Sequence, residues 1–290
     1  MILIDIFESL RPKQWTKNLF MFAGLLFAQN IFNLPLLSKV TGAFFTFCLL
    51  AGSVYILNDL TDLEEDRRHP IKRLRPIASG RLKPIQAIAA LIIFLTFSLT
   101  MSYRLNYSFF MVTVVYLLLQ VAYSLWLKGL VILDVLVVAS GFFLRVIAGA
   151  VVAAVEMSSW LLICTIFLSL FLTLSKRRHD LVVIGQAVQP HKKVLGEYNP
   201  YLLDQMISMI TASTLVTYTL YTMSEETVKK FGTKNLIFTI PFVLYGIFRY
   251  LYLIYEKGQG GNPENILVRD IPLMVDIVLW VAAIGLILYG

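Results

Sequence analysis

The chain has 290 residues, of which 58% are hydrophobic and only 15% are charged. Soluble domains are about half apolar and about a quarter charged, so water cannot be the main solvent of this chain. The formal net charge of +7 would suit a nucleic-acid partner, but the basic residues are concentrated in a few loops between apolar runs, which argues against that class of protein.

Nine apolar runs predict nine membrane-spanning α-helices. A helix needs about 20 apolar residues to cross the hydrocarbon core, and lipid offers no partner to unpaired backbone groups, so helices are the expected element. The runs cover residues 18–32, 40–57, 86–103, 107–127, 130–155, 159–175, 201–223, 236–255 and 271–289. The predicted fold class is therefore an all-α integral membrane protein with a single transmembrane domain over residues 1–290.

The segment before the first run, residues 1–10, predicts a short amphipathic helix that lies on the membrane. Asp5 and Glu8 and the lack of a basic start argue against a cleavable signal peptide. Cys48 and Cys164 fall inside apolar runs without any partner spacing, so they are interpreted as small buried hydrophobic residues rather than disulfide partners or metal ligands.

The loops on the two sides of the predicted bundle differ in their basic residues. Most Lys and Arg residues fall in the loops on the side of the N-terminus. The positive-inside rule then predicts a cytoplasmic N-terminus, two long cytoplasmic loops at about 58–84 and 176–200, and a C-terminus outside the cell. Such a chain is a multi-pass protein of the inner (plasma) membrane.

An acidic stretch opens the first long loop, where the second run ends. If the helix continues, Asn58, Asp62 and Asp66 follow one another at four-residue intervals, and Asp59 stands three residues before Asp62. Crowded like charges are costly unless a cation lies among them, and Mg²⁺ combines a few carboxylates with water and substrate phosphate oxygens. The stretch predicts a magnesium site with Asn58, Asp59, Asp62 and Asp66 as ligands, and a solvated acidic helix end is the alternative.

A basic stretch follows the acidic one directly. Pro70 and Pro76 interrupt any helix there and leave a folded loop. Acidic residues followed at once by basic ones suit a metal-bridged phosphate whose other oxygens meet Arg or Lys. The ordinary alternative is orientation in the membrane or contact with anionic lipid headgroups. The candidate anion-binding residues of this loop are Arg67, Lys72, Arg73 and Arg75.

The second long loop opens with a basic run, residues 176–180, that holds a single carboxylate, Asp180. It therefore predicts an anion-binding loop, with Lys176 and Arg177 as candidates, rather than a second magnesium site. His179 and His191 lack the spacing of paired zinc ligands and are interpreted as solvated surface residues.

Ionisable residues inside the runs are few, and each is a candidate site because charge is costly in lipid. Three of them are Asp134, Arg145 and Arg249. An intramembrane ion pair is the structural interpretation, and an Arg145 side chain that faces a cavity for a lipid phosphate is the functional one.

The stretch from Asn58 to Asp66 matches the NDxxDxxxD signature of the UbiA-type intramembrane prenyltransferases, and the predicted nine-helix bundle with cytoplasmic active-site loops resembles that superfamily. Within it, the chain resembles the decaprenyl-phosphate phosphoribosyltransferase branch. The residues that carry this likeness are 10–18, 66–80, 133–134 with 140–149, 175–178, and 262–264 with Asp270. The basic run 176–180 stands where ordinary prenyltransferases are expected to have a second aspartate-rich motif.

The resemblance implies a Mg²⁺-dependent transfer of 5-phosphoribose from phosphoribosyl diphosphate to a polyprenyl phosphate, with release of pyrophosphate, for cell-envelope precursors. It makes Asp59, Asp62 and Asp66 the catalytic carboxylates. The implied substrate-binding residues are Lys17, Asn58, Arg67, Lys72, Arg73, Arg75, Asp134, Arg145, Lys176 and Arg177. An aromatic prenyltransferase of the same superfamily is the nearer alternative, and a membrane transporter or lipid-binding protein is the alternative from another class. Assembly as a homo-oligomer stays open.

Overall fold

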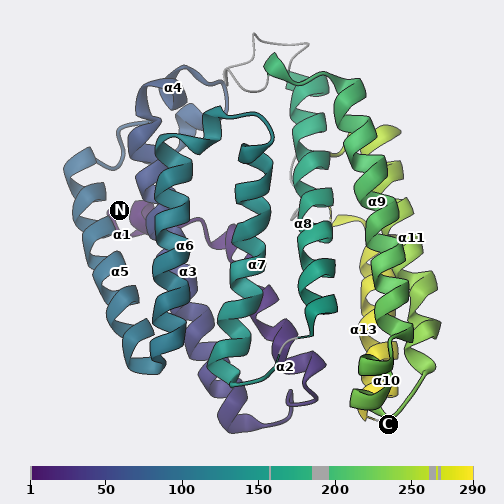
Figure 1. Cartoon of the computed structure of the whole chain (residues 1–290). Helices are drawn as coiled ribbons and strands as arrows, with labels where there is room; N and C mark the ends of the chain where they lie inside the picture. Colours follow the sequence, from purple (N-terminus) through teal and green to yellow (C-terminus); the bar gives the residue numbers. More distant parts are fainter. Residues whose placement is uncertain (1, 157, 185–195, 261–265, 267–268, 290) are drawn as a thin grey trace. The chain divides into compact units, whose positions relative to one another are not determined.

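The structure is a computed structural model that describes residues 2–156, 158–184, 196–260, 266 and 269–289 (Figure 1). Within these ranges all regular elements are helical. The chain divides into two compact units, Met1–Met157 and Ser158–Gly290, which are described one at a time. The single transmembrane domain predicted for residues 1–290 stays a prediction.

Seven helical segments in the described part of the chain are long and apolar enough to cross a membrane. In the first unit they are α3 (Leu34–Thr61), α5 (Pro84–Leu105), α6 (Tyr107–Leu125) and α7 (Leu133–Ala153). In the second unit they are Ser159–Val182, which contains α8 (Ser159–His179), Asn235–Tyr255, which contains α11 (Ile240–Tyr255), and α13 (Ile271–Tyr289). The all-α membrane class is confirmed, whereas the count of nine spans is not.

The first predicted span is not one α-helix. Residues 12–27 form a 3₁₀ segment, η1 (Pro12–Phe22), and the five-residue α2 (Ala23–Phe27). Asn18 interrupts the apolar pattern, and its buried side chain forms hydrogen bonds inside the unit instead of facing lipid. The segment packs against α7.

The predicted seventh span, 201–223, is the 24-residue helix α9 (Pro200–Met223), which is absent from the seven apolar segments. Asp204, Gln205 and a series of Ser and Thr residues lower its hydropathy. Thr211, Thr214 and Thr217 are buried in the second unit, where α9 packs against α8 and α11. The residues that weaken its apolar character therefore partly face protein.

In the first unit, α3 packs against α5, α6 and α7 (Figure 1). Phe47 of α3, Phe109 of α6 and Ala148 of α7 belong to one buried apolar cluster, which also includes Met21 and Leu25 of the N-terminal segment. Asn33 begins α3 by accepting a hydrogen bond from the Leu36 amide, as N-cap residues do. The long helix carries Asn58 and Asp59, the start of the acidic stretch, in its last turn.

The predicted amphipathic lead-in forms α1 (Ile2–Ser9). It exposes apolar side chains and buries Asp5, which forms an ion pair of 3.0 Å with Arg81. Arg81 also donates hydrogen bonds of 3.0 Å to Glu8 and of 3.2 Å to the Leu74 carbonyl. These contacts tie α1 to the basic loop. The exposed apolar residues of α1 are Ile2, Leu3, Ile4 and Phe7.

In the second unit, α8 packs on α9, α9 on α11, and α11 on α13. Asp276 is a carboxylate inside the apolar helix α13 and is only 9% exposed. A Cβ added to Gly246 of α11 would lie 2.9 Å from Asp276 Oδ2. Gly246 therefore has no side chain that would collide with the Asp276 carboxylate.

Gly149 provides a stability test, because the backbone of η1 approaches α7 closely at this residue. A Cβ at this position would lie 1.8 Å from the Met21 carbonyl oxygen, which is backbone and cannot rotate away. We expect Gly149→Ala to lower the free energy of unfolding by about 3 kcal/mol, the upper part of the usual cost of overpacking. Thermal unfolding in detergent would measure it.

Gly285→Ala in α13 is the control for this test, because nothing lies within 4 Å of its added Cβ. Alanine in a helix interior is favoured over glycine by about 0.5–1 kcal/mol, so this variant should unfold at the same or a slightly higher temperature. An equal effect of both substitutions would show that the close approach of η1 to α7 is not what matters.

Candidate functional site

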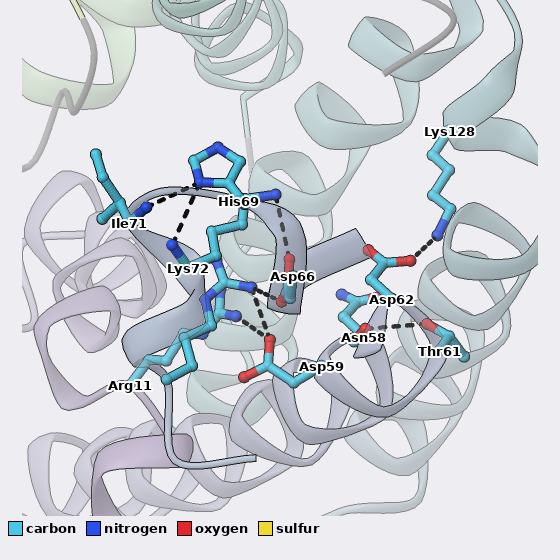
Figure 2. A network of polar contacts seen from close by, with 11 residues as sticks. Arg11, Asn58, Asp59, Thr61, Asp62, Asp66, His69, Ile71, Lys72 and Lys128 are labelled. Carbon is cyan, nitrogen blue, oxygen red and sulfur yellow. Dashed lines mark hydrogen bonds and ion pairs between the residues drawn. The ribbon is translucent and has the colours of Figure 1, made fainter. Parts of the chain in front are cut away.

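The acidic stretch does not continue α3 as one helix, as the sequence had led us to expect. α3 ends at Thr61, Asp62 is its C-cap, and a new short helix, α4 (Leu63–Arg68), follows. The Asp62 amide still donates to the Asn58 carbonyl at 2.9 Å and the Asp66 amide to the Asp62 carbonyl at 2.8 Å, but the Asp62 backbone has φ −98° and ψ 14°, outside the α-helical region. The prediction of one uninterrupted helical face is wrong, and the acidic side chains turn toward different neighbours (Figure 2).

Asp59 and Asp66 meet at a shared cation. Arg75 Nη1 lies 3.0 Å from Asp59 Oδ1 and 2.5 Å from Asp66 Oδ2. Lys72 Nζ lies 3.4 Å from the other oxygen of Asp66. The carboxylate side chains are only 3% and 1% exposed, and two buried like charges require compensation by cations. The structure therefore brings together four of the predicted site residues.

Arg11 is a second cation on Asp59. Its Nη2 forms an ion pair with Asp59 Oδ1, and its guanidinium lies over the Tyr55 ring, 4.9 Å from the centroid. The Arg11 backbone has φ 52° and ψ 64° directly before Pro12, a left-handed conformation that costs about 1–3 kcal/mol for a non-glycine residue. The fold holds Arg11 in this conformation while its side chain reaches the acidic residues.

Asp62 has a different partner from Asp59 and Asp66. Lys128, in the short turn between α6 and α7, forms an ion pair with Asp62 Oδ1 (Figure 2). Asp62 is 24% exposed, so its carboxylate is more accessible than the buried pair. Asn58 lies beside Asp62 in the same turn (Figure 2). The predicted ligand set is thus divided between two neighbouring groups.

Two predicted anion binders of the basic loop lie outside this arrangement. Arg67 is exposed and pairs with Glu64 at 2.7 Å, three residues earlier on α4. Arg73 is exposed in the 3₁₀ turn Lys72–Leu74. His69 organises the turn, because its Nδ1 accepts hydrogen bonds from the amides of Ile71 and Lys72 at 3.2 and 3.3 Å. Of the four basic candidates, only Lys72 and Arg75 contact the buried carboxylates.

Arg145 lies in a separate buried network of the first unit. It donates to Asn18 Oδ1 at 2.7 Å, to the Gly141 carbonyl at 2.6 Å and to the Tyr116 hydroxyl at 2.9 Å. Its guanidinium also lies within 5.6 Å of the Phe47 and Phe142 ring centroids. Neutral oxygens and aromatic rings surround this cation.

The remaining predicted residues of the first unit lie on two of its helices. Asp134 is fully buried in the first turn of α7, and Lys17 is half-buried in η1. Both take part in polar contacts. Their role in binding substrate stays a prediction.

The basic run of the second unit lies at the C-terminal end of α8, where Lys176 is half-buried and Arg177 is buried. The next residue, Arg178, binds Asp204 of α9 at 2.5 Å and lies over the Tyr255 ring of α11, 3.9 Å from the centroid. This contact holds three helix ends together. His191 and residues 262–264 lie outside the described residues, as do residues 185–195 of the predicted loop 176–200.

Two cations of the site, Arg11 and Lys128, and one buried carboxylate, Asp276, escaped the sequence analysis. Arg11 and Lys128 look like ordinary loop cations, and only the fold brings them to Asp59 and Asp62. Asp276 could have been found from the sequence, because a lone carboxylate in an apolar run is itself a signal.

The residues around Arg75 fit a hard divalent cation. No cluster of three or more His, Cys, Asp or Glu side chains suited to a metal occurs in the described part of the chain. Mg²⁺ nevertheless needs only one or two carboxylates when phosphate oxygens and water complete its shell. Asp59 and Asp66 supply two, and the buried Asp66 Oδ1 accepts no hydrogen bond. The donor set therefore fits Mg²⁺ bound together with a phosphate.

This membrane bundle, with buried carboxylates at the end of a long helix, belongs to a known class of membrane enzymes. The model of the UbiA prenyltransferase family matches residues 18–185, and the chain belongs to this family. Family membership makes the chain a membrane-embedded transferase.

Relatives and solved structures give more detail. The chain is 33% identical to the decaprenyl-phosphate phosphoribosyltransferase of Mycolicibacterium smegmatis over 98% of this chain and 92% of that protein. It is 32% identical to the enzyme of the same name from Mycobacterium tuberculosis over 98% of this chain and 94% of that protein. A UbiA homolog from Archaeoglobus fulgidus, solved with DMAPP and Mg²⁺, has a similar fold, with a TM-score of 0.74, 19% identity and coverage of 98% of this chain and 99% of that one.

Arg75→Gln tests whether the shared cation holds the site together. Its loss leaves Asp59 and Asp66 buried beside each other with less compensation. We expect the free energy of unfolding to fall by about 3 kcal/mol, the lower end of the cost of breaking a buried ion pair. Adding Asp66→Asn should restore part of that loss, because it removes one of the two buried charges. Additive losses in the double variant would contradict this account.

A second ion pair predicts a pH dependence. Arg249 donates hydrogen bonds of 3.0 and 2.8 Å to Asp270, and these, with a further one from the Leu273 amide, hold the pKa of Asp270 below its ordinary value of about 3.9. A lowered folded-state pKa stabilises the fold above the ordinary pKa, and this stabilisation is lost as pH falls through the folded value.

The measurement compares the wild type with Asp270→Asn from neutral pH downward. The difference in unfolding temperature should be constant to about pH 5 and shrink below about pH 4. Glu256→Gln, at an exposed position, should give no such change. A difference that grows as pH falls would contradict the sign.

Proposed function

We propose that the chain transfers 5-phosphoribose from phosphoribosyl diphosphate to a polyprenyl phosphate and releases pyrophosphate, in a reaction that depends on Mg²⁺. The product is a lipid-linked sugar phosphate for the cell envelope, made at the cytoplasmic side of the plasma membrane. The observation that carries the proposal is the similarity over nearly the whole chain to proteins named decaprenyl-phosphate phosphoribosyltransferase.

The geometry of the first unit supports the donor half of this proposal. Asp59 and Asp66 lie buried beneath side chains that are partly exposed. Arg11, Lys72 and Arg75 are 26%, 31% and 29% exposed. An anion that arrives from water would meet the cations first and the carboxylates behind them. This order suits a diphosphate that carries a divalent cation on its inner side.

The residues would divide the chemistry as follows. Asp59 and Asp66 would hold Mg²⁺, with Asp62 and Asn58 of the neighbouring turn completing the predicted set. Bound Mg²⁺ would neutralise the charge that develops on the leaving pyrophosphate as the ribose C1–O bond breaks.

The basic residues would orient the phosphates of donor and acceptor. Lys72 and Arg75, which pair with the buried carboxylates and are partly exposed, would bind oxygens of the donor. The acceptor phosphate is already an anion, so it needs no strong general base. Lys17, Arg67, Arg73, Asp134, Arg145, Lys176 and Arg177 stay candidates for binding the other phosphates.

The decisive assay supplies the purified full chain with Mg²⁺, labelled phosphoribosyl diphosphate and polyprenyl phosphates of several lengths. Label in the lipid phase that disappears with chelator is the expected result. No label with any acceptor, together with label transfer from a prenyl diphosphate to hydroxybenzoate, would replace the proposal with aromatic prenylation by the same family.

Asp59→Asn should lower lipid labelling at least about a hundredfold, the scale of losing one preorganised electrostatic group. Glu65→Gln, an exposed carboxylate on α4, should retain wild-type turnover and controls for loss of negative charge in the same stretch. Equal turnover of Asp59→Asn and the wild type would remove Asp59 from the site.

A further inference from the structure

One oxygen of Asp59 is already paired with two cations. Its Oδ1 is bound by Arg11 Nη2 and by Arg75 Nη1, and the same Arg75 nitrogen binds Asp66 Oδ2. A carboxylate oxygen has two lone pairs, so both are engaged by guanidinium groups. A divalent cation that ligates this oxygen must displace at least one guanidinium group. A divalent cation that ligates the other oxygen of Asp59 is repelled by both guanidinium groups.

Arg11 is held in place for this contact by several elements. The Leu10 side chain packs on Gly52 of α3, where an added Cβ would lie 2.6 Å from Leu10 Cδ2. The Leu10 carbonyl accepts a hydrogen bond from Trp15 Nε1 at 3.3 Å. The Arg11 amide and carbonyl form hydrogen bonds with Glu8 and Gln14 at 3.0 and 2.8 Å. The strained backbone is therefore fixed on both sides, and the side chain is aimed at Asp59.

A guanidinium that is displaced from a carboxylate can bind to the diphosphate instead. The side chains of Arg11 and Arg75 reach the water-accessible side, whereas Asp59 and Asp66 are almost fully covered. A diphosphate on that side offers oxygens that bind guanidinium in a forked, charge-assisted geometry. Each arginine can then exchange a carboxylate partner for a phosphate partner without becoming an unpaired buried charge.

We infer that Arg11 and Arg75 are exchangeable counter-ions, which pair with the carboxylates until a diphosphate binds and thereby make binding of the divalent cation conditional on the diphosphate. This inference rests on the proposed function only in requiring that a metal diphosphate binds here. Coupling of this kind is reciprocal, so the arginines must oppose the metal alone and favour the diphosphate.

Two binding measurements on the purified full chain test the inference, and they should change in opposite directions. Binding of Mn²⁺ alone, followed by electron paramagnetic resonance, should be about tenfold tighter in Arg11→Gln than in the wild type, a factor within the usual range for coupled sites. Binding of labelled pyrophosphate at saturating Mg²⁺ should be about tenfold weaker in the same variant. If Arg11 had a purely structural role, Arg11→Gln would weaken the binding of both Mn²⁺ and pyrophosphate.

Control variants distinguish an effect of the arginine charge from an effect on folding. Arg11→Lys keeps the charge and should leave Mn²⁺ binding close to wild type. Arg68→Gln removes an exposed arginine of α4 and should change neither measurement. Arg75→Gln should repeat the opposed pair of changes, and Mn²⁺ should raise its unfolding temperature more than that of the wild type, so the test does not depend on one variant folding.

Unchanged or weaker Mn²⁺ binding in both Arg11→Gln and Arg75→Gln would overturn the inference. Neither measurement uses a ribose donor or a lipid acceptor. The counter-ion exchange can therefore fail while lipid labelling succeeds, or hold while lipid labelling fails.

Discussion

The charge balance around Asp59 and Asp66 is the constraint on which the site depends. Two carboxylates that are almost fully buried at the end of a membrane helix are tolerable only with cations against them. The chain supplies those cations from both directions along the sequence, Arg11 from before α3 and Lys72 and Arg75 from the loop after it. The basic loop and the N-terminal lead-in are thus required by the acidic stretch rather than being separate features.

The fold serves this balance by fixing the route of the N-terminal segment. Arg81 joins α1 to the basic loop, Leu10 packs on Gly52, and η1 is seated against α7. These contacts hold the strained backbone at Arg11, which a free chain would leave for a more populated conformation. Packing far from the carboxylates therefore determines where one of their cations stands.

Sequence reasoning identified the membrane class, most spans and the acidic and basic stretches, because apolar run length and the proximity of charges along the chain are local properties. It failed where the conformation depends on packing between residues that are far apart in the sequence. Asp62 turns to Lys128 because α3 ends at Thr61, and nothing in residues 58–66 announces that break. Residues 12–27 are too polar at their N-terminal end to form a single transmembrane helix. The 3₁₀ conformation of η1 depends on its packing against α7. The sequence analysis treated Arg11 as an ordinary loop cation, because its role depends on Asp59, which lies 48 residues away along the chain.

The packing of η1 against α7 also determines the order in which parts of the first unit fold. The hydrogen bond between Asn18 and Arg145 spans 127 residues, and Gly149 admits the Met21 backbone at the same contact. The N-terminal segment leaves the ribosome first, yet its docking surface does not exist until α7 has been synthesised and inserted. Local helices form early, and contacts of such long sequence separation form late. A segment made before α7 is thus packed only after α7 is in place, and until then the contacts that fix the route of Arg11 to Asp59 are incomplete.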